Sequence, residues 1–216
     1  LKGGQLRERD YRVSGTEMAV SSGEPWVVEA DGQTLTASDG PARVLRDNAT
    51  EARFIGENPA FGWELTYQLL GPGRITQTLT LTPKRPLRVE RVWLWSAPSS
   101  EAPVVARTGL QDIAAFYRHG ADGLFVSLDF PWSRITVADG ETRVGYPPCD
   151  EVDAGEAYVC HSLTVGATRV TGRVRHGYCE GEVDAVDAYV QERFAPRFNR
   201  PSPAGYTAPV PQPPPG

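Results

Sequence analysis

The sequence predicts an all-β domain, a large antiparallel β-sandwich that ends in one C-terminal helix. Three observations support this fold class. Apolar and polar residues alternate with a period of two in several runs, as in strands that bury one face. Turn-forming Gly, Pro and Asp residues separate these runs every ~8–12 residues, which is typical of sandwiches and barrels. A single stretch near the C-terminus changes to helical periodicity.

The clearest pair of strands lies in the first half of the chain. Residues Trp63–Leu69 alternate apolar and polar side chains, Gly71-Pro72-Gly73 breaks the pattern, and Ile75–Leu81 resumes it. Two alternating runs around a Gly-Pro-Gly break predict a β-hairpin. One face of the second run, expected to pack inward while the other meets water, carries Ile75, Gln77, Leu79 and Leu81.

A third strand is expected at Leu87–Trp95. Its alternation places one set of residues on one side: Leu87, Val89, Arg91, Trp93 and Trp95. The other side still carries Val92 and Leu94, so both faces of this strand are expected to be covered.

Further strands follow from the same signals. They are expected at Trp26–Ala30, Gln33–Ala37, Ala42–Leu45, Ala52–Ile55, Leu124–Asp129, Arg134–Ala138, Thr142–Tyr146, Ala157–Val165 and Val170–Arg175. The dipeptides Asp31-Gly32 and Asp139-Gly140 are typical of two-residue hairpin turns. Residues 108–119 break the pattern and fit either a short helix or an irregular loop.

The C-terminal part divides into a helix and a tail. Residues 180–194 place Val183, Val186, Tyr189 and Val190 on one stripe and carry acidic residues in the first turn, which predicts an amphipathic helix. Residues 1–195 therefore form the sandwich domain with its helix. Residues 196–216 contain eight prolines and are expected to be a linker or a disordered tail.

Composition excludes several classes of function. The net charge is −5, which argues against binding to nucleic acid, and no run approaches the ~20 apolar residues of a membrane helix. No nucleotide-binding or metalloprotease motif is present, and the three cysteines form no C-x-x-C pair, so neither a cofactor nor a metal site is expected. The cysteines fit three reduced thiols or one bridge with one free thiol. Asn48-Ala49-Thr50 marks a loop.

A candidate binding site lies where predicted strands end. Pro131 forces a turn after the strand ending at Asp129, and this turn places Trp132 at a loop tip. An exposed indole can stack on the C–H face of a sugar, while a carboxylate accepts hydrogen bonds from its hydroxyls. Tyr146 ends another strand before Pro147-Pro148, where its side chain is expected to face solvent. Asp129, Trp132 and Tyr146 are therefore the candidate substrate-binding residues; alternatively, Trp132 folds back onto the sandwich and Asp129 caps the turn.

Several segments together resemble a known domain. They are Thr78–Thr82, Pro86–Val92, Gly123–Ser133, Gly181–Val190 and Pro196–Phe198. Their order is similar to the N-terminal supersandwich domain, galactose-mutarotase-like in architecture, of melibiase-like and related retaining α-glycosidases. The resemblance spans roughly residues 15–198 and implies a linker helix leading into a catalytic (β/α)₈ barrel, with the catalytic carboxylates on that barrel. It favours a periplasmic or extracellular location.

Three functions remain open at this point. The first is a non-catalytic, carbohydrate-associated domain that flanks a glycoside hydrolase barrel absent from this chain, so that the chain is a fragment of a hydrolase. The second is a mutarotase-like sugar epimerase, in which His161 or His176 acts with a carboxylate as an acid–base pair. The third is a free-standing sugar-binding or structural sandwich. No catalytic residue is assigned, and any sugar binding is expected to be weak.

Overall fold

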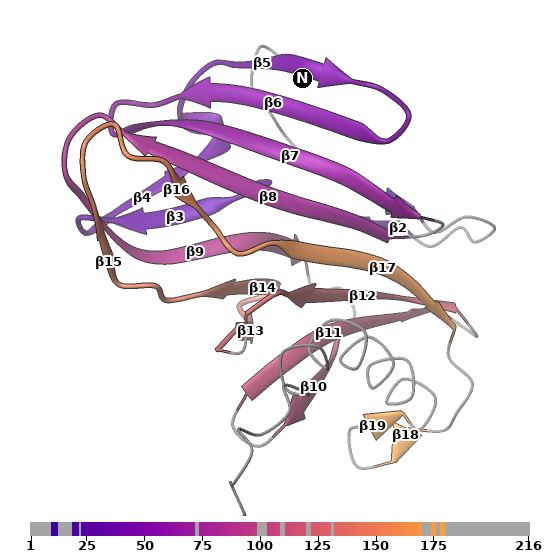
Figure 1. Cartoon of the computed structure of the whole chain (residues 1–216). Helices are drawn as coiled ribbons and strands as arrows, with labels where there is room; N and C mark the ends of the chain where they lie inside the picture. Colours follow the sequence, from indigo (N-terminus) through magenta and orange to yellow (C-terminus); the bar gives the residue numbers. More distant parts are fainter. Residues whose placement is uncertain are drawn as a thin grey trace, which may run out of the picture.

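The computed structural model describes residues 10–12, 19–21, 23–71, 74–98, 103–108, 111–119, 122–130, 132–169, 174–175 and 178–179. Most of them lie in antiparallel strands, and the longer strands form two large sheets, which confirms the predicted all-β sandwich (Figure 1). The predicted helix at 180–194 and the Pro-rich tail at 196–216 lie outside the described residues.

The larger sheet has nine strands, ordered β10-β11-β12-β17-β8-β7-β6-β5, with β16 also paired to β8. Its strands are β5 (Ala42–Asp47), β6 (Glu51–Glu57), β7 (Phe61–Gly71), β8 (Arg74–Pro83), β10 (Val104–Thr108), β11 (Gln111–His119), β12 (Asp122–Leu128), β16 (Tyr158–Val159) and β17 (Leu163–Arg169).

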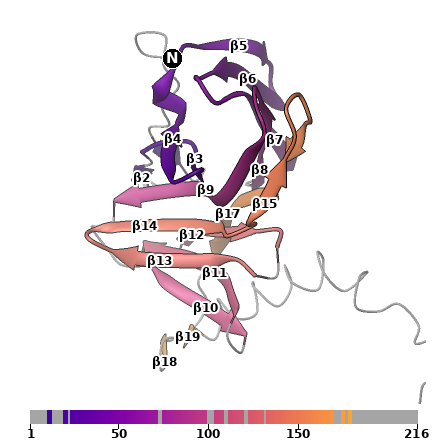
Figure 2. The ribbon, with the colours of Figure 1, turned by 90° about the vertical axis from the view of Figure 1, so that its left-hand side faces the viewer.

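The smaller sheet has six strands, ordered β13-β14-β9-β3-β4, with β15 also paired to β9. Its strands are β3 (Val27–Ala30), β4 (Gln33–Thr36), β9 (Leu87–Pro98), β13 (Arg134–Ala138), β14 (Glu141–Tyr146) and β15 (Asp150–Val152). After a 90° turn the layers separate, with β3 and β4 facing β7 and β8 across the interior (Figure 2).

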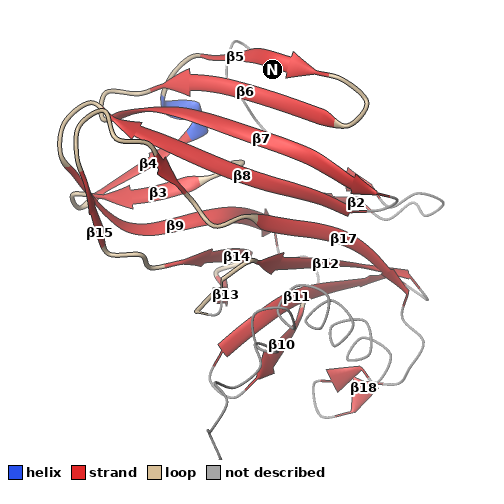
Figure 3. Cartoon of the chain, viewed as in Figure 1, coloured by secondary structure: helices blue, strands red, loops and turns tan. Residues whose placement is uncertain are grey.

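Shorter elements complete the described chain. A one-turn 3-10 helix, η1 (Ala37–Asp39), follows β4 and is blue in Figure 3. Two small hairpins pair β1 (Asp10–Arg12) with β2 (Ala19–Ser21) and β18 (Val174–Arg175) with β19 (Tyr178–Cys179).

The hairpins predicted from turn residues are confirmed. In the β7–β8 hairpin, Trp63 pairs with Leu81 and Leu65 with Leu79, and all four side chains are buried. The β3–β4 and β13–β14 turns each place Asp and Gly at positive φ, at Asp31-Gly32 and Asp139-Gly140. This geometry matches the right-handed twist of the strands, which explains the sequence preference.

The core fills the space between the inner faces of the two sheets. Trp26 precedes β3 and contacts two rings of β7, with centroid distances of 5.7 Å to Phe61 and 5.5 Å to Trp63. On the other side of the core, Trp95 of β9 donates a hydrogen bond of 2.9 Å to the Tyr117 hydroxyl of β11. Gln77 is buried as expected, and its amide donates to the Pro25 carbonyl. These aromatic and polar contacts join one sheet to the other.

The predicted face of Leu87–Trp95 is wrong because β9 contains two bulges. The pairing shifts at Glu90 against β3 and at Leu94 against β14. An extra residue reverses the alternation of side chains beyond it. Arg91 and Trp93 therefore face away from the core, where the guanidinium lies 5.6 Å from the indole centroid. Both faces of β9 are covered at its centre, as expected.

Within residues 108–119, the described residues form neither a helix nor an irregular loop. Thr108 ends β10, and Gln111–His119 form β11, which pairs with β10 and β12. The run Ile113-Ala114-Ala115 weakens the alternating signal, and pairing on both sides of β11 determines the strand conformation instead.

Candidate functional site

The loop between β12 and β13 carries two of the predicted site residues. At its start, the Asp129 N–H donates to the Ser162 carbonyl at 2.8 Å. At its end, the Ser133 hydroxyl donates to the Asp112 carbonyl, and the Ile135 N–H donates to the Asp112 carboxylate at 2.8 Å. The loop is thus held at both ends by strands of the larger sheet and the segment before β17.

Phe130 is the centre of an aromatic cluster built on this loop. Its ring centroid lies 5.6 Å from Trp132, 5.3 Å from Tyr146 and 4.1 Å from His161, with the imidazole stacked at 21°. The Tyr146 and His161 rings also meet edge to face at 4.9 Å. We call these four residues the aromatic cluster.

The two ends of the cluster differ in exposure. Trp132 is 64% exposed, so its indole is open to solvent as predicted, whereas Tyr146 is only 2% exposed. The expectation that Tyr146 faces solvent is therefore wrong. Its hydroxyl lies inside the sandwich and accepts a 3.3 Å hydrogen bond from the His161 N–H. Burial raises the pKa of Tyr146 far above its usual value, so the hydroxyl stays protonated.

The buried ring of Tyr146 therefore forms the inner side of the aromatic cluster. Two further groups lie against it. Burial raises the pKa of the Cys160 thiol to about 12, and the Tyr158 hydroxyl donates to the Asp150 carboxylate at 2.9 Å. Cys160 is a buried free thiol, while Cys149 is an exposed one. Neither takes part in a bridge; the side chain of Cys179 lies outside the described part of the chain.

The structure brings Trp132 and Tyr146 together through Phe130, and Asp129 opens the same loop, half-buried. Sequence reasoning missed Phe130 as the link between them. The sequence makes His161 a candidate for an acid–base pair with a carboxylate and does not indicate its place in this cluster. The signal that places it here is the interruption of the predicted strand Ala157–Val165 into β16 and β17, which leaves residues 160–162 between strands. His176 lies outside the described residues.

No metal centre is indicated at this site. Across the described residues, no group of three His, Cys, Asp or Glu side chains lies close enough together to hold a metal ion. No helix in that same part of the chain has the length and apolar character to span a membrane.

Comparisons with known proteins give distant structural likenesses. No protein family and no curated protein sequence matches this chain. A solved structure described as "Putative kojibiose phosphorylase from human microbiome" matches with a TM-score of 0.48 and 8% identity, over 89% of this chain and 28% of that one. Heparan sulfate lyase HepC from Pedobacter heparinus matches with a TM-score of 0.46 and 10% identity, over 72% of this chain and 26% of that one. This chain thus spans little more than a quarter of either protein.

Proposed function

We propose that this chain is a non-catalytic, carbohydrate-associated β-sandwich domain that flanks a glycoside hydrolase barrel. The observation that carries the carbohydrate part is the exposed Trp132 indole, fixed against Phe130 on a loop that is held at both ends. A flat apolar surface of this kind suits the C–H face of a sugar ring. Asp129, in the same loop, supplies a carboxylate for the hydroxyls.

The cluster is preorganised for this role. Stacking of His161 on Phe130 and the buried position of Tyr146 fix the Phe130 ring before any ligand arrives. Little conformational entropy then has to be lost on binding. One exposed indole still supplies only a few kcal/mol, so the affinity for a single sugar is expected to be millimolar, ~4 kcal/mol.

The non-catalytic part of the proposal has a separate basis. The resemblance to the supersandwich domain implies that the catalytic carboxylates belong to the barrel, and none is assigned to this chain. The chain should therefore neither hydrolyse aryl glycosides nor accelerate mutarotation. Measurable mutarotation that disappears in His161→Ala would overturn the proposal in favour of an epimerase.

Titration of hexoses and short oligosaccharides, followed by tryptophan fluorescence and calorimetry, tests the binding site. Trp132→Ala should abolish the calorimetric signal, because it removes the stacking surface without disturbing the core. Val159→Ala is a matched control, since Val159 is equally exposed at 64% but lies on β16 of the larger sheet. Binding that persists unchanged in Trp132→Ala would place the site elsewhere.

A further inference from the structure

A hollow lies on the outer face of the larger sheet, away from the aromatic cluster. Its volume is about 550 Å³. Residues of β5, β6 and β7, together with Pro41 just before β5, line it: Pro41, Ala42, Arg43, Ile55, Gly56, Glu57 and Gly62. The pairing shows which face it occupies. Four of the lining residues, Arg43, Ile55, Glu57 and Gly62, lie by their pairing on the face opposite to Trp63, whose side chain is in the core.

Gly62 lines the hollow and has no side chain to occupy it. A Cβ atom at Gly62 would meet no atom closer than 4.0 Å, so the space beside it is open. At Gly56, by contrast, a Cβ atom would lie 2.3 Å from the Trp63 ring, which already fills that side. These two glycines are diagonal neighbours on β6 and β7. A side chain at Gly56 would overlap occupied space, whereas a side chain at Gly62 would enter open space.

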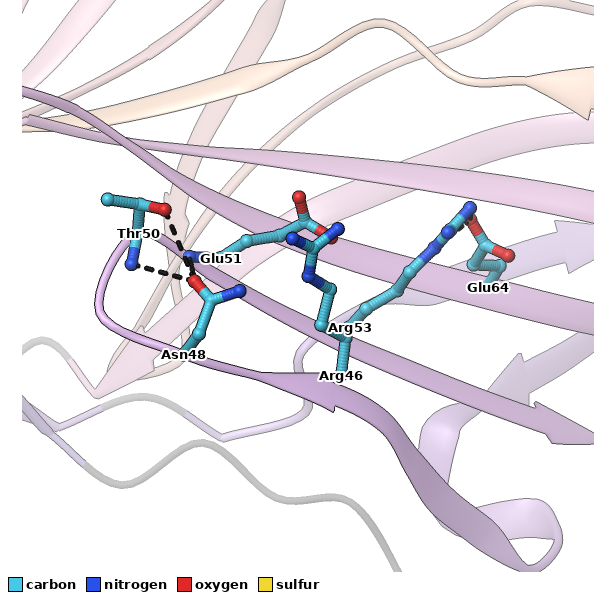
Figure 4. A network of polar contacts seen from close by, with 6 residues as sticks. All are labelled: Arg46, Asn48, Thr50, Glu51, Arg53 and Glu64. Atoms are coloured by element: carbon cyan, nitrogen blue, oxygen red, sulfur yellow. Dashed lines mark hydrogen bonds and ion pairs between the residues drawn. The ribbon is translucent and has the colours of Figure 1, made fainter.

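The charges around the hollow are paired except for one. Glu57 pairs with Lys84 at 2.9 Å, and Glu64 pairs with Arg53 at 2.5 Å. Arg46 lies 3.6 Å from Glu51 in the neighbouring network, which Figure 4 shows along β5 to β7. Within the described part of the chain, the Arg43 guanidinium forms neither a hydrogen bond nor an ion pair. The lining therefore presents one uncompensated positive charge.

An uncompensated guanidinium selects a planar anion, since its fork of N–H donors matches a carboxylate. Ile55 adds an apolar wall, and the Glu57–Lys84 pair adds an acceptor and donors that suit hydroxyl groups. The volume exceeds that of a simple carboxylate such as acetate and lies within the range of small-ligand pockets.

We propose that this hollow binds an acidic sugar unit, with its carboxylate on Arg43 and its hydroxyls toward Glu57 and Lys84. The sugar part of this inference rests on the proposed function, while the carboxylate part rests on the charge of the hollow alone. No aromatic side chain lines this hollow, so the two sites recognise different features of a sugar. Trp132 stacks on a sugar ring, and Arg43 recognises a charged substituent.

Titration of glucuronate, glucose and acetate against the whole chain carrying Trp132→Ala, which removes the proposed neutral-sugar site, tests this directly by NMR or calorimetry. Glucuronate should bind, and both glucose and acetate should bind about tenfold more weakly or not at all, because each lacks one of the two features recognised. Rising salt concentration should weaken glucuronate binding. If acetate bound as tightly as glucuronate, recognition of the sugar ring would be ruled out. If glucose bound as tightly, recognition of the carboxylate would be ruled out.

Two variants locate the site. Arg43→Gln should weaken glucuronate binding about tenfold, since a charge-assisted pair is lost, while Arg88→Gln should not. Arg88 is a matched control because it is an exposed strand arginine whose guanidinium also has no partner among the described residues. Gly62→Val should narrow the hollow and weaken binding. Thr82→Val, a cross-strand neighbour on the same face, should not.

The test separates this inference from the proposed function. Trp132→Ala should leave glucuronate binding at the hollow unchanged, and Arg43→Gln should leave the binding of neutral sugars at Trp132 unchanged. Folding of each variant is checked by its melting temperature. Undiminished glucuronate binding in both folded variants, Arg43→Gln and Gly62→Val, would overturn the inference. So would an absence of glucuronate binding to the wild-type chain.

Discussion

The aromatic cluster and the outer face of β5 to β7 are built in different ways. The cluster joins side chains from loops and strand ends as far apart in the sequence as Phe130 and His161. Its inner half is buried. The outer face follows the register of neighbouring strands, which is regular from β6 to β7 and shifts once in β5 at Leu45, and its charges form ion pairs in water. Burial therefore determines stability in the aromatic cluster, while local residue spacing determines charge and shape on the outer face.

The largest effect should come from the buried side of the cluster. Tyr146→Ala should lower the free energy of unfolding by about 3–5 kcal/mol, because it leaves a cavity beneath Phe130 and His161. Trp132→Ala should change it by less than about 1 kcal/mol, since the indole is mostly exposed. Urea denaturation measures both. Similar losses in the two variants would show that the cluster is not divided into a buried base and an open rim.

The second effect contrasts the two glycines of the outer region. Gly56→Ala should destabilise the chain by about 1–3 kcal/mol, because the new methyl group overlaps the buried Trp63 ring. Gly62→Ala should be neutral or stabilising by up to about 1 kcal/mol, because the space is open and alanine is less flexible in the unfolded chain. Thermal unfolding distinguishes them. A destabilised Gly62→Ala variant would mean that the hollow is already filled.

Alkaline pH should affect the cluster and spare the outer face. Burial raises the pKa of Cys160 from 9.0 to about 12, and it also raises the pKa of Tyr146. A group with a raised pKa in the folded chain stabilises it fully below the pKa of the unfolded chain, and this contribution is lost as pH rises toward the folded value. Stability should therefore fall above about pH 9, by about 1.4 kcal/mol per pH unit for each group.

The Cys160→Ala variant sharpens this test. Its pH-dependent loss should begin nearer the ordinary tyrosine pKa of 10.0 and be shallower, because one titrating group has been removed. The opposite sign applies to Glu57 in the outer region, whose hydrogen bond with Lys84 lowers its pKa. Its contribution is present at neutral pH and disappears in acid. A wild-type unfolding midpoint that stays constant from pH 8 to pH 11 would contradict the alkaline prediction.

The smallest effect should come from the turn at the edge of the outer face. The Asn48 side-chain oxygen accepts from the N–H groups of Thr50 and Glu51 at 3.0 Å and 2.9 Å, as Figure 4 shows. Asn48→Ala should cost about 0.5–1 kcal/mol, because these exposed donors can turn to water. Asn48→Asp keeps the acceptor and should retain most of the stability. Equal losses in both variants would contradict this role.

The sequence predicted the parts of the fold that depend on neighbouring residues. Alternation within Trp63–Leu81 and the turn pairs Asp31-Gly32 and Asp139-Gly140 gave correct hairpins. The same reasoning failed for β9, because nothing local marks Glu90 and Leu94 as bulged residues; the pairing with β3 and β14 decides it. It left residues 108–119 undecided for the same reason.

The candidate site was predicted in part. Trp132 is exposed, as expected from a proline that follows the strand in the sequence, because a proline after a strand acts locally. The burial of Tyr146 could not be foreseen, since it depends on residues 160–162, which approach from a distant part of the chain and bring His161 to the cluster.

The sequence by itself determined the all-β class, the hairpins and the exposed indole, since these follow from side-chain period, turn chemistry and backbone preference over a few residues. Only the tertiary structure decided that Phe130 joins Trp132 to Tyr146, and that Arg43, which has no partner among the described residues, lines the same hollow as an open glycine. Both depend on which strands become neighbours. Burial of the whole core determines which strands pair, and no single segment of the sequence specifies this pairing.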